Sequence, residues 1–165
     1  MANSPSAADT PDTARPRRYV AATVVRAGDV PDTGTTSLSP WDVAGGDRRA
    51  EAVMGLVLPG LRTHWNDDPE PGDDFRSRLW IWDDALTSWA TVDYDGRRLD
   101  TFHVRQHGPR RLWDEVAAAW SRWTGAGRPA FDAFGLDVGV GVDVDGTQTV
   151  WCGDPDGPTW PIPPG

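Results

Sequence analysis

Three closely spaced β-strands followed by one tryptophan-rich helix constrain the fold of this chain more than any other feature. The strands are predicted at 78–84, 88–94 and 99–107, because β-branched and aromatic residues dominate each run. The connections between them are short, and the second contains Asp95-Gly96, a strong signal for a tight turn. Connections this short favour an antiparallel meander, which is the predicted arrangement.

A helix is predicted at about 109–124. Gly108-Pro109 ends the preceding strand, and proline suits the first position of a helix. Apolar residues recur at helical spacing beyond it, and glycines with Pro129 end the pattern. We expect the resulting apolar face to pack on the sheet. That face holds Leu112, Trp113, Val116, Trp120 and Trp123.

The other segments give weaker signals. Residues 1–17 lack periodicity and are predicted to be a disordered tail. A first strand is predicted at 18–28 and a Pro-, Gly- and Ser/Thr-rich loop at 29–40. Leucine and valine alternate strictly with Asp or Gly over 136–144, which predicts one strand of a hairpin that returns over 147–153.

The stretch before Pro59 allows two predictions. Asp47 would cap a short helix that begins within 47–51. The apolar run "AVMGLVL" would equally form a buried strand ending at Pro59, and we favour the strand. After residue 153 we expect an irregular tail that Trp160 pins down.

Together these elements predict an α+β fold. We expect a strongly curved antiparallel sheet, built as a meander of hairpins, packed against the one main helix. The sequence gives no sign of an internal repeat or a domain break, so a single domain is predicted over 18–160.

Charge and composition exclude several classes of protein. The net charge is −9, from 25 acidic and 16 basic residues, so nucleic-acid binding is not expected. Only 38% of the residues are hydrophobic, but ten tryptophans offset this because each buries a large area. No apolar run reaches the ~18 residues that a membrane span needs, and the N-terminus lacks a secretory signal. A cytoplasmic protein that does not contact membranes is predicted.

The single cysteine, Cys152, excludes an internal disulfide framework and a cysteine-rich metal site. It agrees with the reducing cytoplasm, and we expect it to be a small buried filler rather than a nucleophile. Dinucleotide, phosphate-loop, nucleophile-elbow and zinc-protease motifs are absent from the sequence, so no cofactor is predicted.

The third predicted strand carries the main candidate binding surface. Alternation directs His103, Arg105 and His107 to one face, and Arg110 and Arg111 follow in the expected first helical turn. Peptide N–H groups at a helix N-terminus favour anions, and guanidinium groups bind carboxylates in bidentate fashion. A carboxylate or another small anion would suit this arrangement.

Structural explanations compete with that interpretation. If Arg105 pairs with a cross-strand aspartate such as Asp93, the same face would be the solvent-exposed side of a half-buried sheet. This is the explanation we favour. A metal site is not predicted, because His103 and His107 would lie about 13 Å apart at ~3.3 Å per residue. The acidic loop at 66–74 is expected to be a solvated hairpin tip, since it lacks the spacing of a calcium loop.

Acid–base catalysis is a more specific alternative function for the same region. Asp114 and Glu115 stand early in the helix, where carboxylates interact favourably with the helix dipole. One of them would otherwise act as a general base near His107, which makes these two, His103 and His107 the catalytic candidates. Aromatic walls of a ligand pocket would come from Trp80, Trp82 and Trp113.

The stretch "VRQHGPRRLWDEVAAAWSRWTGAGRPAFDAFGLDV", together with "DGTQTVWCGDPD", resembles a known family. It is similar to the C-terminal domain of bacterial protein-L-isoaspartate O-methyltransferase-like enzymes from modified-peptide biosynthesis clusters, including FxLD systems. The motifs are "QHGPRRLWDE", "GRP" and "FGL", the similarity covers roughly residues 55–156, and 139–144 look like an added stretch. In the family, a catalytic half that binds S-adenosylmethionine precedes this domain.

The first 54 residues here are too few for that catalytic half and contain no matching Gly-rich turn. The resemblance therefore implies an accessory role, in which the protein recognises a peptide substrate or supports a partner enzyme, and it maps no catalytic residue. Acidic patches would favour a basic partner, and the three arginines named above would take an acidic segment. A homodimer is left open.

Two other functions compete with this one. A small standalone cyclase, isomerase or lyase would need a closed pocket into which His103 or His107 projects. The accessory role described above, which is that of a binding module, needs instead an open edge or groove with exposed tryptophans. The third alternative is a structural domain without a small ligand.

Overall fold

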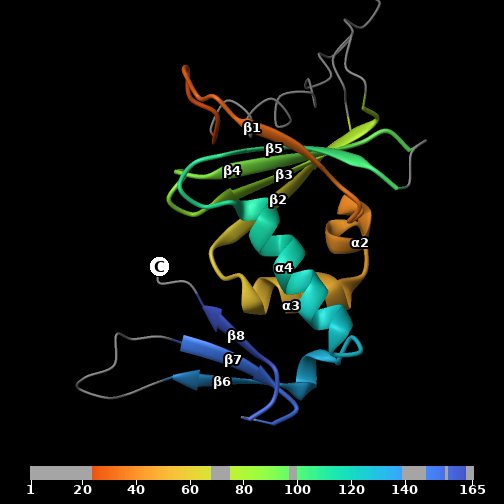
Figure 1. Ribbon diagram of the computed structural model, residues 1–165, viewed down its shortest axis with the longest axis vertical. Helices are drawn as coiled ribbons and strands as arrows, with labels where there is room; N and C mark the ends of the chain where they lie inside the picture. The colour runs from red at the N-terminus through yellow and green to blue at the C-terminus, as the bar shows by residue number, and fades with distance from the viewer. Residues whose placement is uncertain (1–23, 68–74, 97–99, 139–147, 155, 163–165) are drawn as a thin grey trace, which may run out of the picture.

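The chain folds into two antiparallel sheets with helices between them (Figure 1). The computed structural model describes residues 24–67, 75–96, 100–138, 148–154 and 156–162. The larger sheet has the order β1-β5-β4-β3-β2, with β1 and β2 as its edges, and the smaller one has the order β6-β7-β8. The α+β class and the antiparallel meander are therefore confirmed, with the main helix packed against the larger sheet.

The elements have the following bounds. The strands are β1 (Asp32–Thr36), β2 (Leu61–Asn66), β3 (Ser77–Asp83), β4 (Trp89–Tyr94), β5 (Phe102–His107), β6 (Phe134–Val138), β7 (Gln148–Cys152) and β8 (Thr159–Ile162). The helices are α2 (Pro40–Ala44), α3 (Arg48–Val57) and α4 (Leu112–Gly125), with a 3-10 turn, η1 (Phe131–Ala133).

One apolar core joins both sheets through α3 and α4. Period-two alternation turns Leu79, Val92 and Val104 from neighbouring strands toward the helices, and all three are buried. Val150 and Trp160 reach the same cluster from the smaller sheet. Burial of one continuous apolar cluster is the main favourable term that holds these layers together.

Two predictions at the N-terminal side were wrong as far as the described residues test them; residues 18–23 of the predicted first strand lie outside that range. The described part of the segment 18–28 contains a turn at Gly28, whose φ is +102°, rather than a strand. The backbone N–H of Arg26 donates to the carboxylate of Asp29 across this turn, at 2.9 Å. The strand lies instead in the predicted loop, where β1 pairs with β5 along its whole length. The predicted tail 1–17 lies outside the described residues.

The favoured strand before Pro59 was also wrong, and the helical alternative is correct. Ala50, Val53, Met54 and Val57 are the buried residues of α3, and their spacing is that of one helical face. Asp47 caps this helix, since its carboxylate accepts a hydrogen bond from the backbone N–H of Arg49 at 2.9 Å.

The main helix is confirmed, but it begins later than predicted. Arg111 is the N-cap and Leu112 the first helical residue, so Pro109, Arg110 and Arg111 precede the helix. The chain is held outside the helix here because Gly108 has a φ of +102° and the N–H of Arg110 donates to Ser88 Oγ at 3.1 Å.

The C-terminal hairpin pairs as predicted, with Val138 opposite Gln148, although its turn lies outside the described residues. Leu136, expected on the apolar side, pairs with the fully buried Val150 but is itself 50% exposed on the edge strand β6. The expected irregular tail contains β8, which pairs with β7 and buries Trp160 to 2% exposure.

None of the described helices is both long enough and apolar enough to cross a membrane.

Candidate functional site

The predicted cationic face lies on the side of the larger sheet that faces away from α4. Phe102, Val104 and Gln106 are buried beneath the helix side, whereas His103 is exposed and Arg105 is half-buried. Arg105 Nη2 lies 3.4 Å from Asp93 Oδ2, and Asp93 also accepts two hydrogen bonds from Arg78. The cross-strand pair expected in the structural explanation is therefore present.

His107 holds the segment before β1 against this face. Its Nδ1 lies 3.2 Å from the carbonyl oxygen of Val30, and its Nε2 lies 3.3 Å from Asp29 Oδ1. The indole of Trp89 donates to the same carboxylate at 3.1 Å. The hydrogen bond from the Arg26 N–H, followed by that from Trp89, lowers the pKa of Asp29. Both ring nitrogens of His107 are thus engaged by the chain itself.

The two arginines before α4 are also paired. Arg110 Nε donates to Glu115 Oε1 at 3.1 Å, and this hydrogen bond raises the pKa of Arg110, although burial acts in the opposite direction. Arg111 contacts the carboxylates of Asp32 and Asp114. An external anion or a reacting proton at these residues would have to compete with carboxylates of the same chain.

The three tryptophans predicted as pocket walls lie on opposite faces of the larger sheet. Trp80 and Trp82 belong to the outer face, where Trp80 packs on Trp89 with ring centroids 5.9 Å apart. Trp113 is buried on the inner side, within α4. Its Nε1 has no hydrogen-bond partner in the structure as described. These three side chains therefore do not form one wall.

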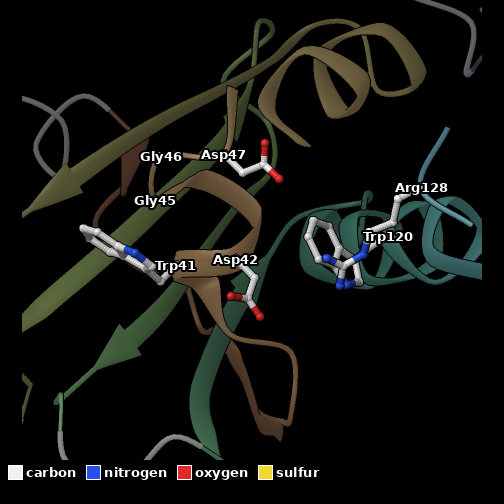
Figure 2. Close-up of a pocket in the computed structure, with 7 residues that line it drawn as sticks. All are labelled: Trp41, Asp42, Gly45, Gly46, Asp47, Trp120 and Arg128. Atoms are coloured by element: carbon white, nitrogen blue, oxygen red, sulfur yellow. The ribbon is translucent and has the colours of Figure 1, made fainter. Parts of the chain in front are cut away.

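An open cavity of about 430 Å³ lies elsewhere, between the α2–α3 connection and the C-terminal end of α4. Figure 2 shows the side chains of Asp42 and Asp47 on one side of this cavity and those of Trp120 and Arg128 on the other. The residues that line it are Trp41, Asp42, Gly45, Gly46, Asp47, Trp120 and Arg128.

Local structure fixes both walls of this cavity. Asp47 is the N-cap of α3, and Asp42 stands in the first turn of α2. Opposite them, the guanidinium carbon of Arg128 lies 5.7 Å from the Trp120 ring centroid and 5.9 Å from that of Trp123. The N–H of Arg128 donates to the carbonyl of Trp123 at 3.0 Å, which ties this residue to the end of α4.

Trp41 stands at the rim of the cavity and is 53% exposed. Its ring packs against Trp65 and Tyr94, at centroid distances of 5.6 Å and 6.3 Å. The indole is thus held in place by neighbouring rings while half of it faces solvent.

A second cavity, of about 190 Å³, is apolar and lies between α3 and the larger sheet. Its walls include Met54, Leu58, Leu79 and Ile81, with Glu51 as the charged residue. His103 and His107 line neither of these two cavities.

Within the described ranges, no group of three or more His, Cys, Asp or Glu side chains is arranged to hold a metal ion. Most of the acidic loop 66–74 lies outside those ranges. Cys152 is buried as expected, and burial raises the pKa of its thiol, which disfavours the reactive thiolate.

The sequence did not identify the 430 Å³ cavity. Its residues come from two segments far apart in the chain, 41–47 and 120–128, and each residue has an ordinary local role as a cap, a helix residue or a loop residue. The sequence offered only Gly45-Gly46, which follow Trp41 by four residues, and an arginine directly after Gly127. Such features are too general to predict a site.

Comparisons with protein-family models, curated proteins and solved structures found no match to this chain, so the family resemblance stays a prediction.

Proposed function

We propose that this protein is a non-catalytic peptide-recognition module that serves the maturation of a peptide natural product, by binding the precursor or by supporting a modifying enzyme. The observation that carries the proposal is the open 430 Å³ cavity beside the half-exposed indole of Trp41. Binding sites for small ligands have volumes of roughly 300–1,000 Å³, so this cavity has room for a few peptide side chains.

The geometry of the catalytic candidates favours binding over catalysis. His107 contacts the carboxylate of Asp29 and the carbonyl of Val30, and His103 points to solvent from the outer face of the sheet. Asp114 and Glu115 are engaged by arginines of the same chain. A cofactor-free cyclase, isomerase or lyase, which is the alternative function, would need at least one of them in an enclosed pocket.

The biosynthetic setting rests on the resemblance of the segment from Val104 to Val138 to the C-terminal domains of isoaspartyl-methyltransferase-like enzymes. Because those enzymes bind S-adenosylmethionine through a separate catalytic half, we expect no heat of binding when S-adenosylmethionine is titrated into this protein by calorimetry. Measurable binding would contradict the accessory role.

Selection from a random peptide library tests the proposal directly. Phage-displayed linear peptides are selected on the immobilised full chain, and each enriched peptide is then measured against the variants Trp41→Ala and Trp120→Ala. We expect both variants to lose at least about fivefold in affinity, because indole rings contribute roughly 1 kcal/mol or more at a binding surface.

Phe131→Ala is the matched control, since Phe131 is an aromatic residue of similar exposure, 52%, that does not line the cavity. Enriched peptides whose affinity falls equally in the control and in the two tryptophan variants would contradict the proposed site. Failure to enrich any peptide that depends on Trp120 would contradict the proposed function.

A further inference from the structure

We infer that the cavity between the α2–α3 connection and α4 selects a peptide segment that carries both a cationic and an anionic side chain. This inference rests on the proposed function and adds the chemical class of the peptide. The cation would lie at the carboxylates of Asp42 and Asp47, and the anion at the guanidinium of Arg128.

The charges that face this cavity differ from those of the cationic face in having no ion-pair partner in the described part of the chain. Across the cationic face, Arg105, Arg110 and Arg111 each contact a carboxylate of the same chain. Around the cavity, in contrast, no ion pair among the described residues involves Asp42 or Arg128. Opposite charges therefore face one space without neutralising each other.

The carboxylate wall is suited to an ammonium or guanidinium group. Asp47 Oδ1 accepts the Arg49 N–H as a helix cap, so its carboxylate is held in one orientation. Asp42 and Asp47 project into the same space from the two sides of the Gly45-Gly46 connection (Figure 2). Two carboxylates that face one cavity attract a cation more strongly than either does alone.

The opposite wall is suited to a carboxylate. The guanidinium of Arg128 is oriented by the Trp120 and Trp123 rings and by its backbone contact with the end of α4. Arg128 has a φ of +56°, a left-handed conformation that few non-glycine residues adopt. A guanidinium that is ordered in advance loses less entropy when it binds a carboxylate in bidentate fashion.

The indole groups explain why a peptide fits better than a free ion. Lysine and arginine carry long apolar stems below the charge, and such stems pack on aromatic surface. Trp120 offers that surface inside the cavity and Trp41 offers it at the rim. A segment with one basic and one acidic side chain would therefore use each kind of group that the cavity presents.

A peptide array on the full-length protein tests this inference. The array contains short peptides with blocked termini, in which every combination of lysine, glutamate, norleucine and glutamine occupies the central positions. Norleucine and glutamine match lysine and glutamate in size without their charge. We expect the tightest binders to contain lysine and glutamate, and expect each neutral replacement to weaken binding about fivefold, as for a partly solvated ion pair.

Variants of the protein assign each charge to its wall. The pair Asp42→Asn with Asp47→Asn removes the carboxylates but retains a side chain that caps helices as well as aspartate does. In this double variant, replacing lysine by norleucine in the peptide should lower the affinity by less than about twofold. Replacing glutamate by glutamine should still lower the affinity as it does with the wild-type protein. Arg128→Gln should give the reverse pattern.

The outcomes separate this inference from the proposed function. If uncharged peptides bind as tightly as lysine–glutamate peptides and still depend on Trp120, the recognition module stands and the charge selection is wrong. If only lysine matters, or if the lysine penalty is unchanged in the double aspartate variant, the inference is also wrong. If no peptide on the array binds in a manner sensitive to Trp120→Ala, both proposals fail. Unchanged thermal unfolding, followed by circular dichroism, serves as the folding control for each variant.

Discussion

Gly108 connects β5 to the segment before α4, and its surroundings leave no room for a side chain. A Cβ atom there would lie 2.3 Å from the carbonyl oxygen of Thr87 and 2.6 Å from Cα of Ser88, and the φ of +102° disfavours other residues. We predict that Gly108→Ala lowers the free energy of unfolding by more than about 2 kcal/mol, because backbone atoms cannot move aside cheaply. Urea unfolding followed by circular dichroism measures this change.

The matched control is Gly125→Ala at the end of α4, where an added Cβ meets no neighbouring atom. Alanine has the higher helix propensity, so this variant should be neutral or more stable by up to about 1 kcal/mol. Equal destabilisation by the two substitutions would show that the close contact at Thr87 and Ser88 does not matter.

Asp29 makes the stability of the protein depend on pH. Its pKa is lowered by the Arg26 N–H and the Trp89 indole, so the folded state holds the carboxylate ionised to lower pH than the unfolded chain does. The stabilisation is therefore present above about pH 4 and is lost as the pH falls through the lowered pKa. We predict that Asp29→Asn unfolds at lower urea than the wild type near neutrality, and that the difference narrows from about pH 5 to about pH 3.

Urea midpoints for both proteins across that range test the prediction. Asparagine retains an oxygen that accepts the Arg26 N–H, so the comparison isolates the charge of the carboxylate. A difference that stays constant down to about pH 3 would contradict the prediction.

At the scale of the elements, local sequence patterns correctly predicted the type of those strands and helices whose two faces differ clearly in polarity. In β5, buried Val104 and Gln106 alternate with the more exposed Arg105 and His107, and this contrast is visible in the sequence. In α3 the apolar run satisfies a strand and a helix equally, and Asp47 with the spacing of the buried residues decides for the helix. The exposed edge strand β1 has no such alternation, and only its pairing with β5 defines it.

The start of α4 depends on a side chain from the sheet. Arg111, its N-cap residue, makes no capping hydrogen bond through its side chain. The buried Gln106 takes that role, because its Oε1 accepts the Trp113 N–H at 3.2 Å and its Nε2 donates to Asp114 at 3.0 Å. A sequence prediction based on neighbouring residues could not find this cap, since it comes from another element.

We predict that Gln106→Met, which preserves size and removes both contacts, lowers the free energy of unfolding by about 1–3 kcal/mol. The loss arises because the N–H of the buried Trp113 is left without an acceptor. Asp114→Asn is the control: it retains an acceptor for Gln106 and leaves the Trp113 contact intact, so we expect a loss below about 1 kcal/mol. Equal losses in urea unfolding would mean that Gln106 does not cap the helix.

At the scale of the whole molecule, the candidate site was harder to predict than the fold. The pairing of Arg105 with a cross-strand aspartate was predicted from the sequence, but the pairing of Arg110 with Glu115 and of Arg111 with Asp32 was not, because both depend on the folded arrangement. The cavity brings Asp42, Asp47 and Arg128 together from distant segments in the same way. Residue types therefore predicted possible chemistry, and tertiary structure decided which charges remain for a ligand.

The continuous core gives a prediction for how the molecule unfolds. Val150 of the smaller sheet is fully buried and belongs to the same apolar cluster as Val92 of the larger sheet. Val150→Ala should lower the free energy of unfolding by about 2 kcal/mol, because it leaves a small cavity in that cluster.

If the sheets unfold as one unit, hydrogen exchange should accelerate by about the same factor, roughly 30-fold, for the protected amides of β4 and of β7. Leu136→Ala, at a half-exposed position of the smaller sheet, should leave the hydrogen-exchange rates of the β4 and β7 amides unchanged. Acceleration confined to β7 would mean that the smaller sheet opens independently, and that the shared core does not couple the two layers.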